Sequence, residues 1–191
     1  MLSTAFIAQL EAQVQELSAT AAQQLRPLSS LQLNAKPTPT SWSVLECLEH
    51  LNRYSCFYNP ALARALQSAP AAAPHQVGFS WLGRKSYDTV KPENVKPQKT
   101  IKYMNPVGSQ LTGEVVEEFL QHQTQLLELL AAARTVELNR KAVRVEFFRL
   151  LKLRLGEALQ FVVAHEQRHV QQALRAAQAA QHLAGPAVLV V

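Results

Sequence analysis

The sequence predicts an all-α fold, a four-helix bundle with long crossover loops. Four segments place apolar residues at spacings of three and four, which is the period of an amphipathic helix. No segment shows a convincing sheet pattern. The chain has 191 residues, of which 48% are hydrophobic, so one domain can bury a core without disulfides or a structural metal.

The first predicted helix covers residues 3–25. Its apolar positions, separated by Gln, Glu and other polar residues, are Phe6, Leu10, Val14, Leu17, Ala21 and Leu25. Pro27 and the Lys-Pro-Thr-Pro segment at 36–39 form a connector, because proline and the residue before it resist helical geometry. A second helix is predicted from Ser43 to about Gln67. It opens with a Ser-Val-Leu-Glu capping box at 43–46, and Pro60 predicts a bend within it.

Residues 70–111 form a Pro- and Lys-rich insertion. Loops of this length tend to be functional or lid-like, so two interpretations stay open, a lid or a loosely ordered crossover. The residues that can pin it onto the bundle are Phe79, Trp81, Tyr87, Ile101 and Tyr103.

Two more helices complete the predicted bundle. Thr112 can cap the third, which runs to about Ala133 and whose stripe contains Val115, Phe119, His122, Leu126, Leu129 and Leu130. Residues 146–155 alternate leucine with basic residues but are too short to assign to a strand or a helix. The last helix follows Gly156 and runs from Glu157 to about His182.

These elements predict a single helical-bundle domain over residues 1–183, including the insertion, and an apolar tail over 184–191. We expect the tail to dock on the bundle or at a dimer interface. No run of about 18 apolar residues is present, which argues against a membrane-spanning helix. The N-terminal segment lacks the basic region of a secretory signal, so we expect a cytoplasmic protein.

The charge pattern does not predict a nucleic-acid partner. The net charge of +5 permits an anionic partner. However, the basic residues of 82–102 and 134–154 are not interleaved with aromatic residues as on a base-stacking surface, and no nucleic-acid motif is present. Cys47 and Cys56 are nine residues apart, which matches neither a CxxC motif nor a zinc ribbon.

The strongest motif lies in the last predicted helix, which reads His165-Glu166-Gln167-Arg168-His169. His165 and His169 are four residues apart, so they share one helix face and can bind one metal ion. The motif also matches H-E-x-x-H, the zinc-protease signature. That interpretation is disfavoured because no acidic residue follows Glu166 to serve as the third ligand, and positions 172 and 175 break the extended motif.

His50, on the second predicted helix, is the best candidate for a third ligand. Three protein ligands leave one position open for water or substrate, which is typical of a catalytic zinc site. From spacing alone, an alternative stays open in which His165 and His169 lie on a solvated face and His50 lies in the core.

Two stretches resemble the DinB-like superfamily, also called YfiT-like metal-dependent bundles. They are Trp-Ser-Val-x-Glu-x-x-x-His-Leu from Trp42, and His-Glu-x-Arg-His-x-x-Gln from His165 to Gln172. The resemblance implies a four-helix bundle that holds a divalent metal, zinc or nickel, with His50, His165 and His169. It also implies a metal-dependent enzyme, a thiol-dependent S-transferase or a hydrolase, that acts on a small-molecule substrate such as a low-molecular-weight thiol. The alternative is a non-catalytic metal-binding or interaction module, and either protein is expected to form a homodimer. The insertion at 70–111 departs from shorter members, so the substrate stays open.

Several residues near the three histidines have two possible roles. Glu46 and Tyr54 lie one turn either side of His50 and can line the site, although Glu46 is better explained as the capping-box residue. Cys47 is a soft fourth ligand or, more simply, a small buried hydrophobe. Glu166 is expected beside the ligands or facing solvent.

Other polar residues receive simpler interpretations. Arg168 and Gln172 can orient an anionic substrate or brace a neighbouring helix. His75 and His182 are expected to be solvated, in a loop and in a terminal turn, and His122 to lie in the core or line a pocket.

Overall fold

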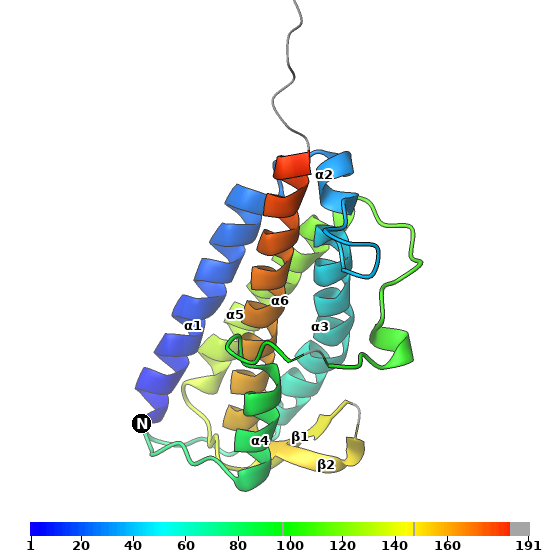
Figure 1. The fold of residues 1–191 in the computed structure, drawn as a ribbon. Helices are drawn as coiled ribbons and strands as arrows, with labels where there is room; N and C mark the ends of the chain where they lie inside the picture. The colour runs from blue at the N-terminus through cyan, green and yellow to red at the C-terminus, as the bar shows by residue number, and fades with distance from the viewer. Residues whose placement is uncertain (97, 147, 184–191) are drawn as a thin grey trace, which may run out of the picture.

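Four long helices form the bundle, as the sequence predicts. The computed structural model describes residues 1–96, 98–146 and 148–183. The bundle helices are α1 (Ser3–Thr20), α3 (Val44–Gln67), α5 (Glu114–Ala133) and α6 (Leu155–Leu183), shown in Figure 1. Helix α3 packs against α5 and α6, and α1 packs against the same two helices. Therefore α1 and α3 occupy diagonal corners of the bundle.

The first two long helices begin where the sequence predicts. Helix α1 continues as a π-helical turn, η1 (Ala21–Leu25), and a short helix, α2 (Ser30–Asn34), lies in the connector. At the start of α3, the Ser43 hydroxyl accepts a hydrogen bond from the Glu46 N–H at 3.2 Å, and the Glu46 carboxylate accepts one from the Ser43 N–H at 2.9 Å. This reciprocal pair is the predicted capping box, and α3 then continues through Pro60.

The insertion at 70–111 contains structure that the sequence analysis did not assign. It holds helix α4 (Trp81–Val90), which packs against α6, and a 3-10 turn, η2 (Lys102–Met104). Phe79 contacts Phe6 edge-on, with ring centroids 5.8 Å apart. Tyr103 is 58% exposed, but its hydroxyl donates a hydrogen bond to the buried Glu146 at 2.5 Å and so helps to hold the insertion as predicted. Trp81 is 69% exposed, so the prediction that its ring pins the insertion is wrong.

A β-hairpin between α5 and α6 corrects the prediction of a bundle without a sheet. Strands β1 (Lys141–Val145) and β2 (Phe148–Arg154) pair antiparallel, with Val143 opposite Leu153. Val143 and Leu153 are buried, whereas Arg144 and Lys152 are exposed. The leucine alternation in 146–155 is therefore a strand signal, and α6 begins at Leu155 rather than Glu157.

The core divides into two apolar clusters along the bundle axis. One cluster includes Phe6 and Leu62, and the other includes Leu17 and Leu45. Along α6, the first cluster ends at Val163 and the second begins at Val170. The predicted metal-binding histidines of α6 therefore lie at the boundary between the two clusters.

Parts of the C-terminal prediction lie outside the described residues. These are the tail at 184–191 and the side chain of His182. Of the helices within the described ranges, none is both long and apolar enough to cross a membrane.

Candidate metal centre

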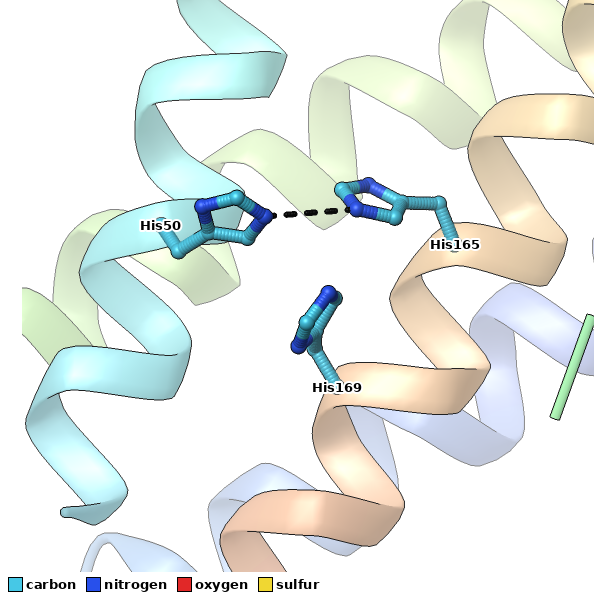
Figure 2. Close-up of side chains that lie close together, drawn as sticks. All are labelled: His50, His165 and His169. Atoms are coloured by element: carbon cyan, nitrogen blue, oxygen red, sulfur yellow. Dashed lines mark hydrogen bonds between the residues drawn. The ribbon is translucent and has the colours of Figure 1, made fainter. Parts of the chain in front are cut away.

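Three histidine side chains converge between α3 and α6 (Figure 2). His165 and His169 project from one face of α6, and His50 faces them from α3. Nε2 of His50 lies 3.3 Å from Nε2 of His165. One ligand nitrogen from each ring lies within 4.8 Å of the other two. The structure therefore brings together the three histidines selected from the sequence.

Burial keeps these imidazoles neutral at physiological pH. His50 is 2% exposed and His165 is 7% exposed, and His169 is partly buried. Loss of solvation lowers the pKa of His50 to about 4 and that of His169 to about 3. Burial also lowers the pKa of His165, and the neighbouring His169 and His50 rings lower it further. Neutral imidazole is the form that binds a metal.

Two contacts at the outer edges of the rings determine which nitrogen faces the centre. Nδ1 of His50 lies 2.8 Å from the carbonyl oxygen of Met104, and Nδ1 of His169 lies 3.0 Å from Oε1 of Gln172. Because carbonyl oxygens only accept, each Nδ1 donates its proton, and a neutral ring then carries its lone pair on Nε2. Such contacts are typical of histidine ligands.

The donor set fits a divalent transition metal. Zinc–nitrogen bonds of about 2.0–2.1 Å in a tetrahedral site place the ligand nitrogens about 3.3 Å apart. The Nε2 atoms of His50 and His165 have this separation, 3.3 Å. Three neutral nitrogen donors suit Zn²⁺ and Ni²⁺, and three protein ligands leave a coordination position for another group.

Aromatic side chains enclose the three imidazoles. The Trp42 ring lies 4.9 Å from that of His50 and 5.7 Å from that of His169, between centroids. Tyr54 lines the site as predicted, with its ring centroid 4.8 Å from that of His50 and 4.5 Å from that of His165. Burial raises the pKa of Tyr54 to about 12, so its phenol is protonated at neutral pH.

Three further predictions concern neighbours of the ligands. Glu46 serves the capping box and also pairs with Lys36 at 2.7 Å. Cys47 is fully buried, and burial raises the pKa of its thiol, which fits the interpretation as a small hydrophobe. Glu166 is only 3% exposed, so the solvent-facing alternative is wrong. Its burial raises the pKa to about 8, although the amide of Gln123 opposes this shift.

Arg168 braces the insertion. Its guanidinium donates hydrogen bonds to the backbone carbonyls of Asn94 and Lys96, the latter at 2.8 Å. Of the two roles expected from the sequence, the contacts favour bracing. Gln172 instead orients His169.

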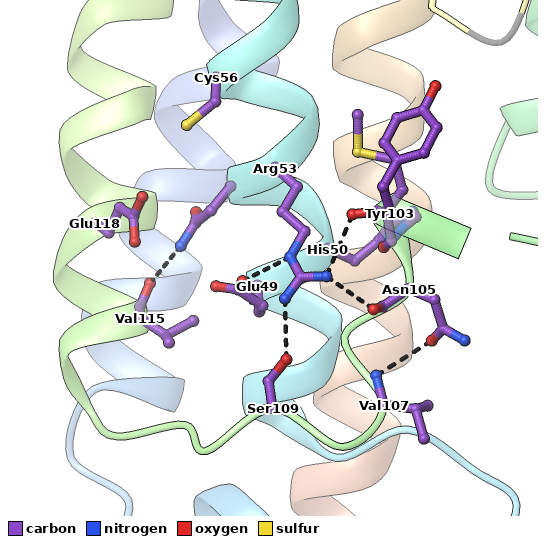
Figure 3. A network of polar contacts seen from close by, with 12 residues as sticks. Glu49, His50, Arg53, Cys56, Tyr103, Asn105, Val107, Ser109, Val115 and Glu118 are labelled. Carbon is purple, nitrogen blue, oxygen red and sulfur yellow. Dashed lines mark hydrogen bonds and ion pairs between the residues drawn. The ribbon is translucent and has the colours of Figure 1, made fainter. Parts of the chain in front are cut away.

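Arg53 holds the same insertion from the side of α3 (Figure 3). It donates to the carbonyl of Tyr103 at 3.3 Å, to that of Asn105 at 2.8 Å, and to the Ser109 hydroxyl at 3.0 Å. Together with Arg168, it holds residues 94–96 and 98–109 against the bundle, and the His50–Met104 bond lies within this segment. We call residues 94–96 and 98–109 the strap. The sequence analysis missed Arg53 and Met104, whose partners are about 50 positions distant and leave no local pattern.

Two other histidines, His75 and His122, lie apart from the three. His75 is partly buried, and its Nε2 accepts a hydrogen bond from the Leu138 N–H at 3.2 Å, so the solvated interpretation is wrong. His122 lies on α5, partly buried beside Cys56 and Glu118. One of the two predictions placed His122 in the core, and that prediction is wrong.

One comparison with known proteins identifies a relationship. The model of the DinB superfamily matches residues 7–173, which is most of the chain and includes all three histidines. No curated protein and no solved structure matches the chain.

Proposed function

The chain belongs to the DinB superfamily, and from this premise we propose that it is a metal-dependent enzyme whose zinc or nickel ion is held by His50, His165 and His169. The observation that carries the proposal is the convergence of three neutral imidazoles with ligand nitrogens within 4.8 Å of one another. No other group of the described residues combines this burial with three nitrogen donors.

A divalent metal bound here supplies Lewis acidity, which lowers the pKa of a thiol or water that coordinates beside the imidazoles. The protein supplies the surroundings. Trp42 and Tyr54 shield the site from bulk water, and the Tyr54 phenol stays protonated and uncharged at neutral pH. The chain supplies three neutral donors and no ligand charge, so an anionic fourth ligand is favoured. We therefore propose a thiol-dependent S-transferase, or a hydrolase, that uses a small-molecule substrate.

The second candidate function is a non-catalytic metal-binding or interaction module. It is favoured by the small exposed fractions of the ligands, 2% for His50 and 7% for His165, which leave little room for a substrate while the strap is in place. A homodimer and a cytoplasmic location belong to both proposals. Light scattering of the purified protein tests the first of these.

Metal analysis followed by a thiol-transfer assay tests the proposal. We expect untagged protein to carry divalent metal at the three-histidine centre, and this one equivalent to be lost in His165→Ala and retained in the control His75→Ala. We also expect transfer of a low-molecular-weight thiol to a soluble electrophile, or hydrolysis of an activated ester, to be abolished in His50→Ala. If His165→Ala keeps its full metal content, the metal centre is wrong. If metal is bound but no thiol or ester is turned over, the non-catalytic module stands.

A further inference from the structure

A second group of metal-ligand side chains lies where α3 faces α5. It comprises Cys56 from α3 and Glu118 and His122 from α5, with one ligand atom of each within 4.8 Å of the others. We propose that Cys56, Glu118 and His122 form a separate zinc site at the surface of the bundle. Figure 3 shows the thiol of Cys56 directed toward α5, on which Glu118 lies.

The distances need little adjustment to accept the ion. Sγ of Cys56 lies 3.7 Å from Nε2 of His122, and Oε1 of Glu118 lies 3.6 Å from the same nitrogen. A tetrahedral zinc ion, with bonds of about 2.3 Å to sulfur and about 2.0–2.2 Å to nitrogen and oxygen, sets ligand separations of about 3.3–3.6 Å. The two distances to Nε2 therefore need shifts of only a few tenths of an ångström, and the third pair, Cys56 and Glu118, has ligand atoms within 4.8 Å of each other.

The imidazole of His122 is oriented for this role. Its Nδ1 lies 3.3 Å from Oε1 of Gln125, so Nδ1 carries the proton and the lone pair on Nε2 points toward Cys56 and Glu118. The amide of Asn59 donates to the same Oε1 at 3.3 Å and so holds Gln125 in place. The same arrangement occurs at His169. In both cases a glutamine three residues later on the helix, Gln125 or Gln172, accepts a hydrogen bond from the Nδ1 of the histidine.

The charges around Cys56 favour a cation over an activated thiol. Partial loss of solvation raises the pKa of Cys56, and the carboxylates of Glu118 and Glu49 raise it further. A thiol in this field is a weak nucleophile at neutral pH. A divalent ion reverses the balance, because it compensates both the thiolate and the carboxylate. Cys56 and Glu118 are exposed, so the ion has direct access from solvent.

Cobalt substitution tests the site, because a thiolate ligand gives Co²⁺ a near-ultraviolet charge-transfer band and imidazoles do not. We expect this band to appear when full-length, reduced, metal-free protein is titrated with Co²⁺. Its final intensity should correspond to one thiolate-bound Co²⁺ per chain. The band should be lost in Cys56→Ser and His122→Ala and retained in His165→Ala. Cys47→Ser is the matched control, since that thiol is fully buried and away from the cluster, and it should keep the band. Absence of the band in the parent protein, or its survival in Cys56→Ser, would overturn the proposal.

Zinc stoichiometry separates this inference from the proposed function. Equilibrium dialysis against Zn²⁺ is expected to give two equivalents for the parent protein and one each for Cys56→Ser and His165→Ala. Circular dichroism of each variant verifies that the helices are intact. If Cys56→Ser loses no zinc, the surface site is refuted and the three-histidine centre is unaffected. If His165→Ala keeps both equivalents while Cys56→Ser loses one, the three-histidine centre is refuted and the surface site is unaffected.

Discussion

The buried histidine cluster and the surface cluster share one design, although they differ in chemistry. In each cluster, α3 contributes one residue, His50 or Cys56. The neighbouring helix contributes two residues that are separated by four positions. The pair is His165 and His169 on α6 in one case, and Glu118 and His122 on α5 in the other. Helical spacing therefore supplies the ligand pair in both. The face of α3 that completes the cluster determines its burial and charge.

The difference in charge separates the roles expected of the two clusters. Three neutral imidazoles leave the full charge of a divalent ion available to an anionic fourth ligand, which favours activation of a thiol or water. At the surface, the Cys56 thiolate and the Glu118 carboxylate together cancel that charge. We therefore expect the buried cluster to activate a nucleophile and the surface cluster to retain an ion without activating one.

The largest expected effect tests whether the two clusters are independent. His169→Ala removes one of three ligands, so we expect zinc affinity of the buried cluster to fall by more than the roughly 10–100-fold that outer contacts contribute. The surface cluster should keep its affinity. Competition with a chromophoric chelator measures the zinc affinity. In a Cys56→Ser background it reports the buried cluster alone, and with Cys56 present it reports both clusters. An equal loss at both would show that they are coupled through α3.

The contacts that orient the histidines should have the next largest effect. Gln172→Ala removes the partner of His169 Nδ1 at 3.0 Å, and Gln125→Ala removes the partner of His122 Nδ1 at 3.3 Å. We expect zinc affinity to fall about 10–100-fold for Gln172→Ala. The loss should be smaller for Gln125→Ala, because Gln125 is exposed and water can replace its oxygen. Isothermal titration calorimetry measures both. If Gln172→Ala binds zinc with unchanged affinity, Gln172 does not orient the His169 ring for metal binding.

The sequence predicted the buried cluster well because its signals are local. The spacing of His165 and His169 and the capping box at Ser43 both act within one or two helical turns. His50 was selected by its likeness to a family pattern, because spacing alone left a core histidine as an alternative. The surface cluster was missed, since Cys56 and His122 are 66 positions apart and only packing of α3 on α5 brings them together.

The insertion and the hairpin show where such reasoning fails. The strap is held by guanidinium contacts to backbone carbonyls, and every residue has a carbonyl, so the sequence contains no pattern for them. The hairpin strand has buried Leu153 beside exposed Lys152, but a run this short fits both periods until it pairs with residues 141–145. Local patterns thus located the four bundle helices, whereas helix α4 and the long-range polar contacts could not be predicted from them.

The pH dependence of metal binding should also distinguish the clusters. The pKa of the Cys56 thiol is raised above its ordinary value, so the thiol is protonated at pH 7–8 and zinc must displace that proton. Zinc affinity of the surface cluster should therefore rise about tenfold per pH unit. The buried imidazoles, with pKa values of about 4 for His50 and about 3 for His169, have no proton to lose in this range. Calorimetry in buffers of different ionisation enthalpy counts the protons released, about one for the surface cluster and none for the buried one.

The smallest expected effect concerns access to the buried cluster. Arg53→Ala removes three contacts that hold the strap, to the carbonyls of Tyr103 and Asn105 and to the Ser109 hydroxyl. Each partly exposed hydrogen bond contributes about 0.5–1.5 kcal/mol. Water compensates part of this loss, so we expect zinc release from the buried cluster to accelerate about three- to tenfold. The three histidines are unchanged, so equilibrium affinity should change less than the release rate.

A matched arginine separates strap opening from a general loss of charge. Arg134 forms an ion pair with Glu11 away from the strap, and Arg134→Ala should leave zinc release unchanged. Stopped-flow transfer of zinc to a chelator, in a Cys56→Ser background, observes the buried cluster alone. If Arg53→Ala and Arg134→Ala release zinc at the same rate, the strap does not limit access. The difference between the clusters would then rest on their ligands, because burial would no longer slow exchange at the buried one.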